Sequence, residues 1–226
     1  MSEIKILVDM LNTNDELALE NKEQFDSLNT FVINLMSAPG SGKTSILERL
    51  IQQLKPHLNL AVIEGDIYTT KDAERIEAQG VPVIQINTAG ACHLDGNMIN
   101  RSLLNFDLRK LDLIIIENVG NLVCPAEFSV GEDIKLSVLS VTEGNDKPLK
   151  YPLMFEKSAA VILNKTDLIP YTNFNKPEFY VDIKSVNPHI EVFETSCTKN
   201  EGMDALSKYV IDKVNHKKSN HKNNNE

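Results

Sequence analysis

The 226-residue sequence predicts an α/β fold, a three-layer sandwich with a mostly parallel sheet covered by helices on both faces. Two observations carry this prediction. Short, continuously apolar segments such as LIIIE (113–117) and AAVIL (159–163) are typical of strands buried on both faces of a sheet. Segments with helical spacing of apolar residues alternate with these strands, as the connections between parallel strands require. The hydrophobic content of 42% is sufficient for a sizeable core.

The elements follow one another along the chain with turn residues between them. The first is an amphipathic helix at about 14–28, with Asn14 at its N-cap and an acidic first turn. The expected strands are 31–36, 60–64, 83–86, 113–117, 135–141, 159–163 and 190–194. The later expected helices are 45–54, 71–79, 96–106 and 203–214. We therefore expect an N-terminal helical extension (1–30) packed on a single nucleotide-binding domain (31–214), and a disordered polar tail (215–226).

Charge and composition exclude several classes of function. The net charge of -9 and the pI of about 5.1 disfavour a nucleic-acid partner, because a phosphate backbone repels an acidic protein. No apolar run approaches about twenty residues and the N-terminus lacks a basic opening, so neither a membrane span nor a signal peptide is expected. The odd set of Cys92, Cys124 and Cys197 indicates reduced thiols. These features predict a cytoplasmic protein.

The motif SAPGSGKT (37–44) lies between an apolar strand and a helix, where a Walker A phosphate-binding loop belongs. Ser37 stands where the strict pattern has glycine, but the chemical groups lie at the other end of the motif. Backbone N–H groups of the loop are suited to phosphate oxygens, Lys43 to the β and γ phosphates, and Thr44 to Mg²⁺. The phosphate-binding residues predicted here are Gly40, Ser41, Gly42, Lys43, Thr44 and Ser45.

The motif NKTD (164–167) follows the strand AAVIL and predicts guanine rather than adenine as the base. The Asp167 carboxylate is able to accept from both N1–H and the exocyclic N2–H of guanine, a donor pair that adenine lacks on that edge. Asn164 is expected to tie neighbouring loops together, and Lys165 to lie over the base. Ser196, Cys197 and Thr198 are typical of the later loop that contacts the base oxygen. We predict that GTP and GDP are the ligands of this site.

Two carboxylates are expected at the carboxyl edge of the sheet, facing the phosphate loop. Asp66 follows the strand at 60–64, and Glu117 ends the strand at 113–117. Asp66 and Glu117 are the candidates for magnesium, together with Thr44, and Asp66 also for positioning the attacking water. Gly120 in ENVG takes the place of a glycine that senses the γ-phosphate. An alternative for Asp66 is an ordinary turn or helix cap.

Two thiols and an imidazole form a second candidate site. Cys92 and His93 are adjacent, and Cys124 follows the ENVG segment. Two thiolates and one imidazole suit Zn²⁺ or Ni²⁺, but three groups are one short of a closed tetrahedral site. Two copies that meet about a two-fold axis would double the set and close a shared site. Without this context, a buried or incidental Cys-His pair is the alternative.

The chain resembles the HypB family, nickel-delivery GTPases of the SIMIBI class that serve [NiFe]-hydrogenase, over all but about the last twelve residues. The segments that carry the resemblance are NDELALENKEQF, SAPGSGKTS, EGDIYTTKDAERI, ACHLD, ENVGNLVCPAEFSVGE, KPLKYP, NKTDL and TSCTKNEGM. It implies a GTPase with low intrinsic turnover that dimerises with GTP and holds nickel or zinc at Cys92, His93 and Cys124 between subunits. It also implies a HypA-type nickel/zinc protein and the hydrogenase large subunit as partners.

Three alternatives remain open from the residues alone. The urease accessory GTPase shares the phosphate loop and NKTDL, but its metal motif is Cys-Pro-His, whereas Cys92 and His93 are adjacent here. A metal-buffering module, in which GTP only orders a dimer, would have the same binding residues without turnover. A small-molecule P-loop kinase would leave the NKTD motif unexplained. Nickel and zinc are not distinguished by the ligand types.

Overall fold

The computed structural model of the chain describes residues 2–66 and 69–223, with the side chains of 12–66 and 69–220. Its centre is a seven-stranded sheet in the order β3-β2-β4-β1-β5-β6-β7, and every neighbouring pair is parallel. The strands are β1 (Phe31–Ser37), β2 (Leu60–Asp66), β3 (Val83–Asn87), β4 (Leu113–Glu117), β5 (Ile134–Ser140), β6 (Ser158–Asn164) and β7 (Glu191–Glu194). The predicted α/β three-layer fold is confirmed.

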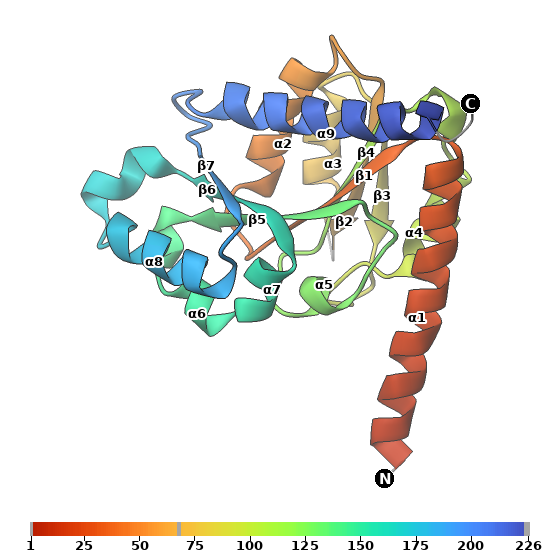
Figure 1. Ribbon diagram of the computed structural model, residues 1–226, viewed down its shortest axis with the longest axis horizontal. Coiled ribbons are helices and arrows are strands. Elements are labelled where there is room, and N and C mark those ends of the chain that lie inside the picture. The colour runs from red at the N-terminus through yellow and green to blue at the C-terminus, as the bar shows by residue number, and fades with distance from the viewer. Residues whose placement is uncertain (1, 67–68, 224–226) are drawn as a thin grey trace.

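Helices cover both faces of the sheet (Figure 1). They are α1 (Ser2–Ser27), α2 (Lys43–Leu54), α3 (Lys71–Glu77), α4 (Gly96–Leu103), α5 (Cys124–Glu127), α6 (Lys147–Lys150), α7 (Pro152–Glu156), α8 (Lys176–Val186) and α9 (Met203–Asn223). Three 3₁₀ segments, Leu108–Lys110, Val141–Glu143 and Thr166–Tyr171, complete the connections described. Among the described residues, no helix is long and apolar enough to cross a bilayer.

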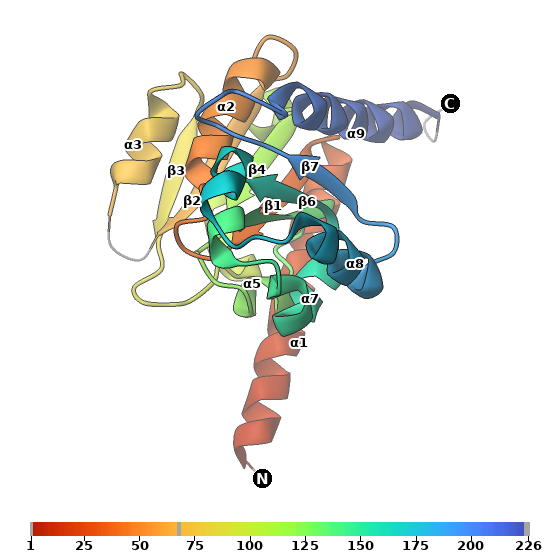
Figure 2. The same ribbon diagram turned by 90° about the vertical axis from the view of Figure 1, so that its left-hand side faces the viewer.

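The alternation of side chains along each strand divides the core between the two faces. On β1, Phe31, Ile33 and Leu35 pack with α2, α3 and α9, whereas Val32 and Met36 point to the opposite face. That opposite face holds two clusters, one under α1 and α4 and one under α5, α7 and α8. Figure 2 shows α2 and α9 on one side of the sheet and α7 and α8 on the other. Continuously apolar strands are therefore buried on both sides, as their composition predicts.

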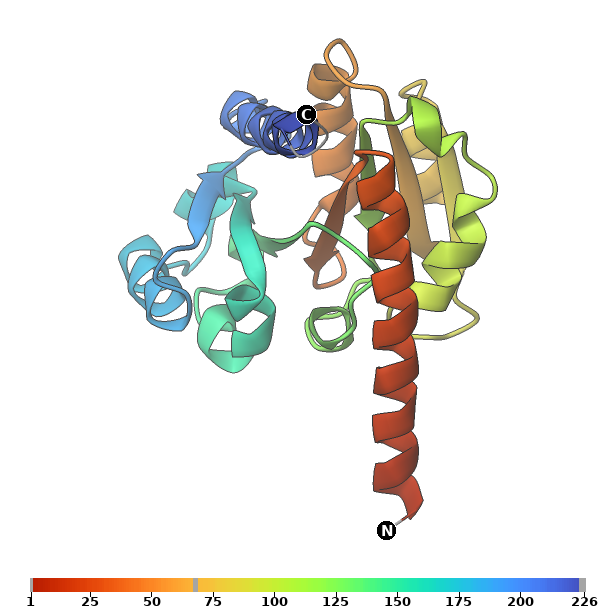
Figure 3. The same ribbon diagram turned by 45° about the vertical axis from the view of Figure 1, so that its right-hand side comes forward.

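The first helix is longer than the sequence predicts, and its position matters for the site. It begins at Ser2 rather than near Asn14, and its N-terminal part extends beyond the body of the protein (Figure 3). Its C-terminal half packs on α4, where Asn21, fully buried, donates from Nδ2 to the carbonyl oxygens of Gly96 (2.8 Å) and Val130 (3.3 Å). Asn14 accepts from the Gly96 N–H at 2.8 Å. The helix therefore supports the loops that carry the candidate metal ligands.

The last helix corrects an expectation. The sequence predicts that it ends near Val214 and that a disordered tail follows, yet α9 continues to Asn223. Lys217 explains the extension, because its ammonium contacts the Asp133 carboxylate at 2.8 Å and the Thr30 carbonyl at 2.8 Å. Lys218 pairs with Asp112 at 2.6 Å. The last three residues of the expected tail, 224–226, lie outside the described residues.

Candidate nucleotide and metal sites

A polar cavity of about 470 Å³ opens at the carboxyl edge of the sheet, where β1, β2 and β4 end. It lies where parallel α/β sheets bind their ligands. The residues that line it come from the phosphate loop, β2, α3, the segment after β4 and the NKTD loop. They are Pro39, Gly40, Gly42, Lys43, Thr44, Ser45, Glu64, Gly65, Asp66, Asp72, Arg75, Glu117, Asn118, Val119, Gly120 and Lys165.

The phosphate loop adopts the turn that its glycines allow. Gly42 has φ +100°, and a Cβ there would lie 2.5 Å from Asn164 Nδ2, so only glycine fits between the two loops. Lys43 Nζ donates to Ser37 Oγ at 2.9 Å, so the serine that replaces the usual glycine accepts a hydrogen bond from the phosphate-binding lysine. Burial lowers the pKa of Lys43, and Glu117 opposes that shift most. An anion in the cavity would offset the same burial cost.

Glu117 and Thr44 meet at the base of this cavity. Thr44 Oγ1 donates to Glu117 Oε1 at 2.8 Å, while Glu117 Oε2 is buried without a hydrogen-bond partner. Burial raises the pKa of Glu117 to about 7. An orphaned carboxylate oxygen beside a hydroxyl fits a hard divalent cation, because oxygen ligands are the ones that Mg²⁺ prefers. Thr44 and Glu117 therefore have the chemistry of the predicted magnesium ligands.

Glu64 is a residue that sequence reasoning missed. It lies directly beside Glu117 in the β2–β4 register, it is 3% exposed, and its Oε2 also has no hydrogen-bond partner. Burial, and then the charge of Glu117, raise the pKa of Glu64 to about 8. A pair of buried carboxylates pointing into one cavity is costly unless a cation accompanies it. Glu64 and Asp72 line the cavity in addition to Asp66 and Glu117, so the carboxylate set is two groups larger than expected.

Asp66 lines the same cavity, but its carboxylate is engaged in a turn. Asp66 Oδ2 accepts from the N–H of Thr69 at 3.0 Å and from its Oγ1 at 2.9 Å. These hydrogen bonds are those of an ordinary turn, the alternative role that the sequence allows for Asp66. Asp66 forms this turn and also lines the cavity. Ile67 and Tyr68 of the same motif lie outside the described residues.

The NKTD loop is tied to the phosphate loop and to the loop after β7. Asn164 Nδ2 donates to the Ser41 carbonyl at 3.0 Å, and Lys165 Nζ donates to the Gly40 carbonyl at 2.7 Å. Ser196 Oγ donates to Asp167 Oδ1 at 2.6 Å, which fixes the orientation of that carboxylate. Cys197 is half-buried and Thr198 is exposed beside them. The structure thus brings together three predicted segments, namely the phosphate loop, the NKTD loop and the loop at 196–198.

The two thiols and the imidazole converge, as their candidate role requires. Cys92 Sγ lies 3.0 Å from Cys124 Sγ and 3.6 Å from His93 Nδ1. The three potential ligand atoms lie within 4.8 Å of one another. The Phe128 ring stacks on His93 with centroids 3.9 Å apart, which limits the orientation of the imidazole. The hydrogen bond with Cys92 raises the pKa of the Cys124 thiol to about 11. A bound cation would lower this pKa, because it stabilises the thiolate.

The metal-ligand loops contact the elements of the nucleotide cavity. A Cβ on Gly120 would lie 3.0 Å from Pro39 Cα, so the segment between Glu117 and Cys124 rests directly on the phosphate loop. The Leu94 side chain, next to His93, packs against Gly65 at the end of β2. Leu94 N–H also donates to Asn118 Oδ1 at 3.0 Å. Both loops that carry the candidate metal ligands therefore contact residues that line the cavity.

The fold and the phosphate loop define a P-loop nucleotide-binding protein. Residues 31–194 match a family described as "CobW/HypB/UreG, nucleotide-binding domain". Hydrogenase maturation factor HypB of Azotobacter vinelandii is 51% identical over 200 residues, which are 88% of this chain and 66% of that protein. The hydrogenase/urease maturation factor HypB of Helicobacter hepaticus is 40% identical over 214 residues, covering 93% of this chain and 88% of that protein. The chain belongs to the HypB family.

Solved structures agree with this assignment. The crystal structure of HypB from Helicobacter pylori in complex with nickel matches with a TM-score of 0.85 and 38% identity, over 90% of this chain and 96% of that one. HypB from Archaeoglobus fulgidus matches with a TM-score of 0.85 and 32% identity, over 90% of this chain and 100% of that one. The signal recognition particle receptor FtsY of Elizabethkingia anophelis, at 18% identity, a TM-score of 0.54, and 80% of this chain and 66% of that one, shares the fold alone. The chain spans about two thirds of the length of the Azotobacter relative.

Proposed function

We propose that this protein is a GTP-hydrolysing metallochaperone that binds nickel or zinc and assists nickel insertion into [NiFe]-hydrogenase. The observation that carries the proposal is the convergence of Cys92, His93 and Cys124 within 4.8 Å on loops that contact the nucleotide cavity. Two thiolates and an imidazole are ligands suited to both metals. The nickel complex of the Helicobacter pylori relative supports the same cargo.

GTP and Mg²⁺ are the cofactors that the cavity fits. Asp167, oriented by Ser196, would accept the guanine N–H pair, and Lys43 would contact the phosphates once it leaves Ser37. Thr44 and Glu117 would hold magnesium, which supplies charge neutralisation at the phosphates. Asp66 would position the attacking water. Gly120, where an added Cβ would lie 3.0 Å from Pro39 Cα, would follow the γ-phosphate. We expect low intrinsic turnover, as the resemblance to the HypB family implies.

A homodimer in the GTP state would complete the metal site. Within the described residues, one chain offers a cluster of three ligand groups, one fewer than a closed tetrahedral zinc site uses. Cys92 is exposed, so a second copy related by a two-fold axis has access to the thiolate. Hydrolysis or nucleotide exchange would then separate the copies and release the ion. The HypA-type nickel/zinc protein and the hydrogenase large subunit are the partners that this cycle would serve.

A urease-related role is a second candidate. The Helicobacter hepaticus relative carries the description "Hydrogenase/urease maturation factor HypB". The match covers 93% of the present chain. The same nickel site and nucleotide cavity would serve either recipient enzyme. Deletion of the gene would distinguish the two, by loss of hydrogenase activity, of urease activity, or of both.

The proposal predicts that Cys92→Ala abolishes the metal-dependent dimer while GTP affinity stays near that of the unaltered protein. Removal of one of three ligands leaves a set too small to hold the ion. Metal content and solution mass are measured with GDP and with a non-hydrolysable GTP analogue, in the presence of nickel and of zinc.

Ser185→Ala is the control, since Ser185 is exposed on α8 and lies outside both the metal-ligand cluster and the nucleotide cavity. It should keep both the metal and the dimer. Retention of nickel and of the dimer by Cys92→Ala would contradict the proposed metal site. Loss of GTP binding in the same variant would instead indicate that Cys92 is needed for folding.

A further inference from the structure

Lys135 on β5 is an almost buried charge that neither nucleotide nor metal binding uses directly. Its side chain is 11% exposed, and that of its ion-pair partner Glu132 is 5% exposed. The β5–β6 pairing shifts register between Lys135 and Leu136, an irregularity of the kind that redirects a side chain. Burial of a charge is expensive unless its hydrogen bonds are satisfied, so the environment of this ammonium needs an explanation.

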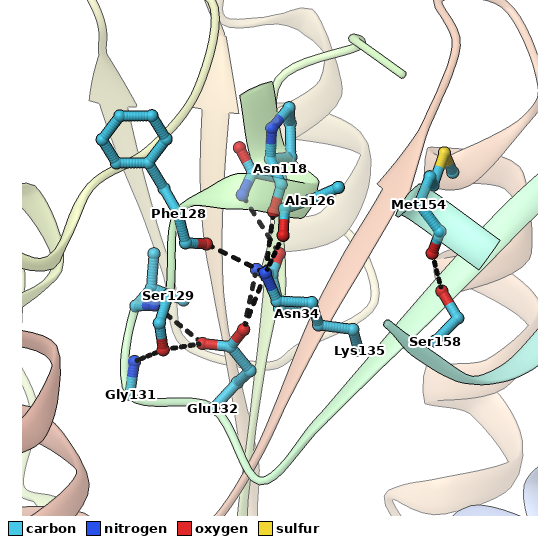
Figure 4. Close-up of polar contacts among 12 residues, drawn as sticks. Asn34, Asn118, Ala126, Phe128, Ser129, Gly131, Glu132, Lys135, Met154 and Ser158 are labelled. Atoms are coloured by element: carbon cyan, nitrogen blue, oxygen red, sulfur yellow. Dashed lines mark hydrogen bonds and ion pairs between the residues drawn. The ribbon is translucent and has the colours of Figure 1, made fainter. Parts of the chain in front are cut away.

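The ammonium of Lys135 is surrounded by backbone oxygens of the segment that follows Cys124. Nζ lies 3.0 Å from the carbonyl oxygens of Pro125, Ala126 and Phe128, and 3.4 Å from Glu132 Oε1. The three N–H donors of a lysine ammonium match the three carbonyls. Figure 4 shows Lys135 reaching the carbonyls of Ala126 and Phe128 from below the turn. One side chain therefore binds three backbone carbonyls of the turn that begins at Cys124.

The position of this turn determines the metal-ligand geometry. At its start, Cys124 Sγ lies 3.0 Å from Cys92 Sγ, and at its end the Phe128 ring stacks on His93. The turn contains only a four-residue helix, α5, which has too few hydrogen bonds to be stable by itself. Its conformation therefore depends on contacts outside the helix, and Lys135 supplies three of them.

A chain of buried polar groups continues from Glu132 to the other metal-ligand loop. Asn34 Nδ2 lies 3.5 Å from Glu132 Oε1, and Asn118 Nδ2 donates to Asn34 Oδ1 at 3.1 Å (Figure 4). Asn118 Oδ1 accepts from the N–H of Leu94 at 3.0 Å, and Leu94 directly follows His93. Asn34 and Asn118 are at most 1% exposed, so this network is fully enclosed. It joins the Cys124 turn to the Cys92–His93 loop through Asn34 on the central strand β1.

We propose that Lys135 is a positioning residue for the metal site, which holds the Cys124 turn so that its thiolate faces Cys92 and His93. Two observations support this proposal. One buried ammonium contacts three carbonyl oxygens of the turn, and an enclosed network of polar side chains leads from Glu132 to Leu94. The inference rests on the proposed function in one respect, that an ion occupies the Cys-His-Cys cluster. The positioning of the two thiols can be measured without any ion.

The first measurement therefore uses metal-free full-length protein treated with diamide, which is reduced to its hydrazine as two thiols form a disulfide. The rate of Cys92–Cys124 disulfide formation is followed by peptide mass spectrometry, because the two sulfurs already lie in contact. Lys135→Met, which keeps the length of the side chain but removes its charge and donors, should slow this reaction. Lys157→Met is the matched control, since it removes an exposed lysine next to the neighbouring strand β6 and should leave the rate unchanged.

The second measurement is Ni²⁺ affinity, with the thiolate-to-nickel absorption band as a reporter of the ligand set. Removal of a group that orients metal ligands costs about ten-fold or more in affinity, and we expect a loss of that size in Lys135→Met. Binding of GTP should remain unchanged. Equal disulfide rates and equal Ni²⁺ affinity in Lys135→Met and Lys157→Met would overturn the proposal.

Two further results separate the possible failures. If Lys135→Met does not fold, Glu132→Gln keeps the lysine but removes its ion pair, and slower disulfide formation in that variant is the expected result, while an unchanged rate overturns the proposal. If the unaltered protein binds no Ni²⁺ at its thiols but Lys135→Met still slows the disulfide, the proposed metal function fails and the positioning role stands.

Discussion

At the scale of single residues, the least expected feature is the pair of buried carboxylates, Glu64 and Glu117. They are neighbours in the β2–β4 register, and each has one oxygen without a hydrogen-bond partner. Burial raises the pKa of both carboxyl groups, to about 8 and about 7. Two such groups destabilise the empty protein and become favourable when a divalent cation occupies the cavity. We infer that these two carboxylates lower the stability of the nucleotide-free protein and favour nucleotide binding with a divalent cation.

Replacement of Glu64 by glutamine tests this inference. Because Gln carries no charge, Glu64→Gln should leave the nucleotide-free protein as stable as before or more stable. The additional stability conferred by Mg²⁺ and GTP should fall by about 1–2 kcal/mol, the size of a lost charged contact. Thermal unfolding with and without Mg²⁺ and GTP measures both quantities. Glu77→Gln, on the exposed face of α3, is the control, and equal nucleotide stabilisation in the two variants would refute the role of Glu64.

Glu64 also shows where sequence reasoning stops at this scale. Asp66 is the more visible candidate in the sequence, because it follows the apolar segment 60–64, while Glu64 belongs to that segment. In the structure β2 includes both residues. Its pairing with Glu117 depends on the register between two strands that are far apart in the chain. A usable signal exists, since a carboxylate inside a continuously buried strand needs a partner. By contrast, Lys43, Thr44, Asn164 and Asp167 are predicted from local motif spacing alone.

At the scale of elements, strands were predictable and the ends of the chain were not. Each expected strand is present within one or two residues, because a buried parallel strand has a strong apolar signal. The helix α8 (Lys176–Val186) was not predicted, and neither were the short helices α5, α6 and α7. Polar composition predicts disorder after Val214, whereas α9 continues to Asn223. Its support comes from Asp26 and Asp133, partners that local composition does not reveal.

The anchoring of α9 by Lys217 leads to a prediction about stability. Lys217 is 14% exposed and contacts both Asp133 and Asp26, so Lys217→Met leaves two carboxylates without this cation. We expect a loss of about 2 kcal/mol in the free energy of unfolding, below the cost of breaking a fully buried pair. Urea denaturation measures this change.

Lys208→Met serves as the control, since it removes an exposed lysine from the same helix. It should change the free energy of unfolding by less than about 0.5 kcal/mol, as surface substitutions usually do. An unchanged free energy of unfolding in Lys217→Met would favour the expectation from the sequence, a polar tail that contributes nothing to the fold.

At the scale of the whole molecule, one edge of the sheet carries both candidate sites. The segment after β4 starts at Glu117, rests on the phosphate loop at Gly120 and reaches Cys124, so one short stretch of chain connects the candidate nucleotide site to the candidate metal site. The buried Asn34–Asn118 pair provides a second link. Family membership and the predicted architecture followed from motif order and spacing. The convergence of Cys92, His93 and Cys124 required the structure, because it depends on two loops from different strands.

The central claim is that nucleotide state and metal affinity are coupled, and linkage provides its most direct test. If the GTP state binds nickel more tightly than the GDP state by some factor, nickel must favour GTP over GDP by the same factor. We predict a factor on the order of ten, within the usual range for coupled sites. The measurement is calorimetric titration of the full chain with Ni²⁺ in the presence of GDP or of a non-hydrolysable GTP analogue, followed by the reverse titration. Equal nickel affinities in both nucleotide states, and equal nucleotide affinities with and without nickel, would contradict the account.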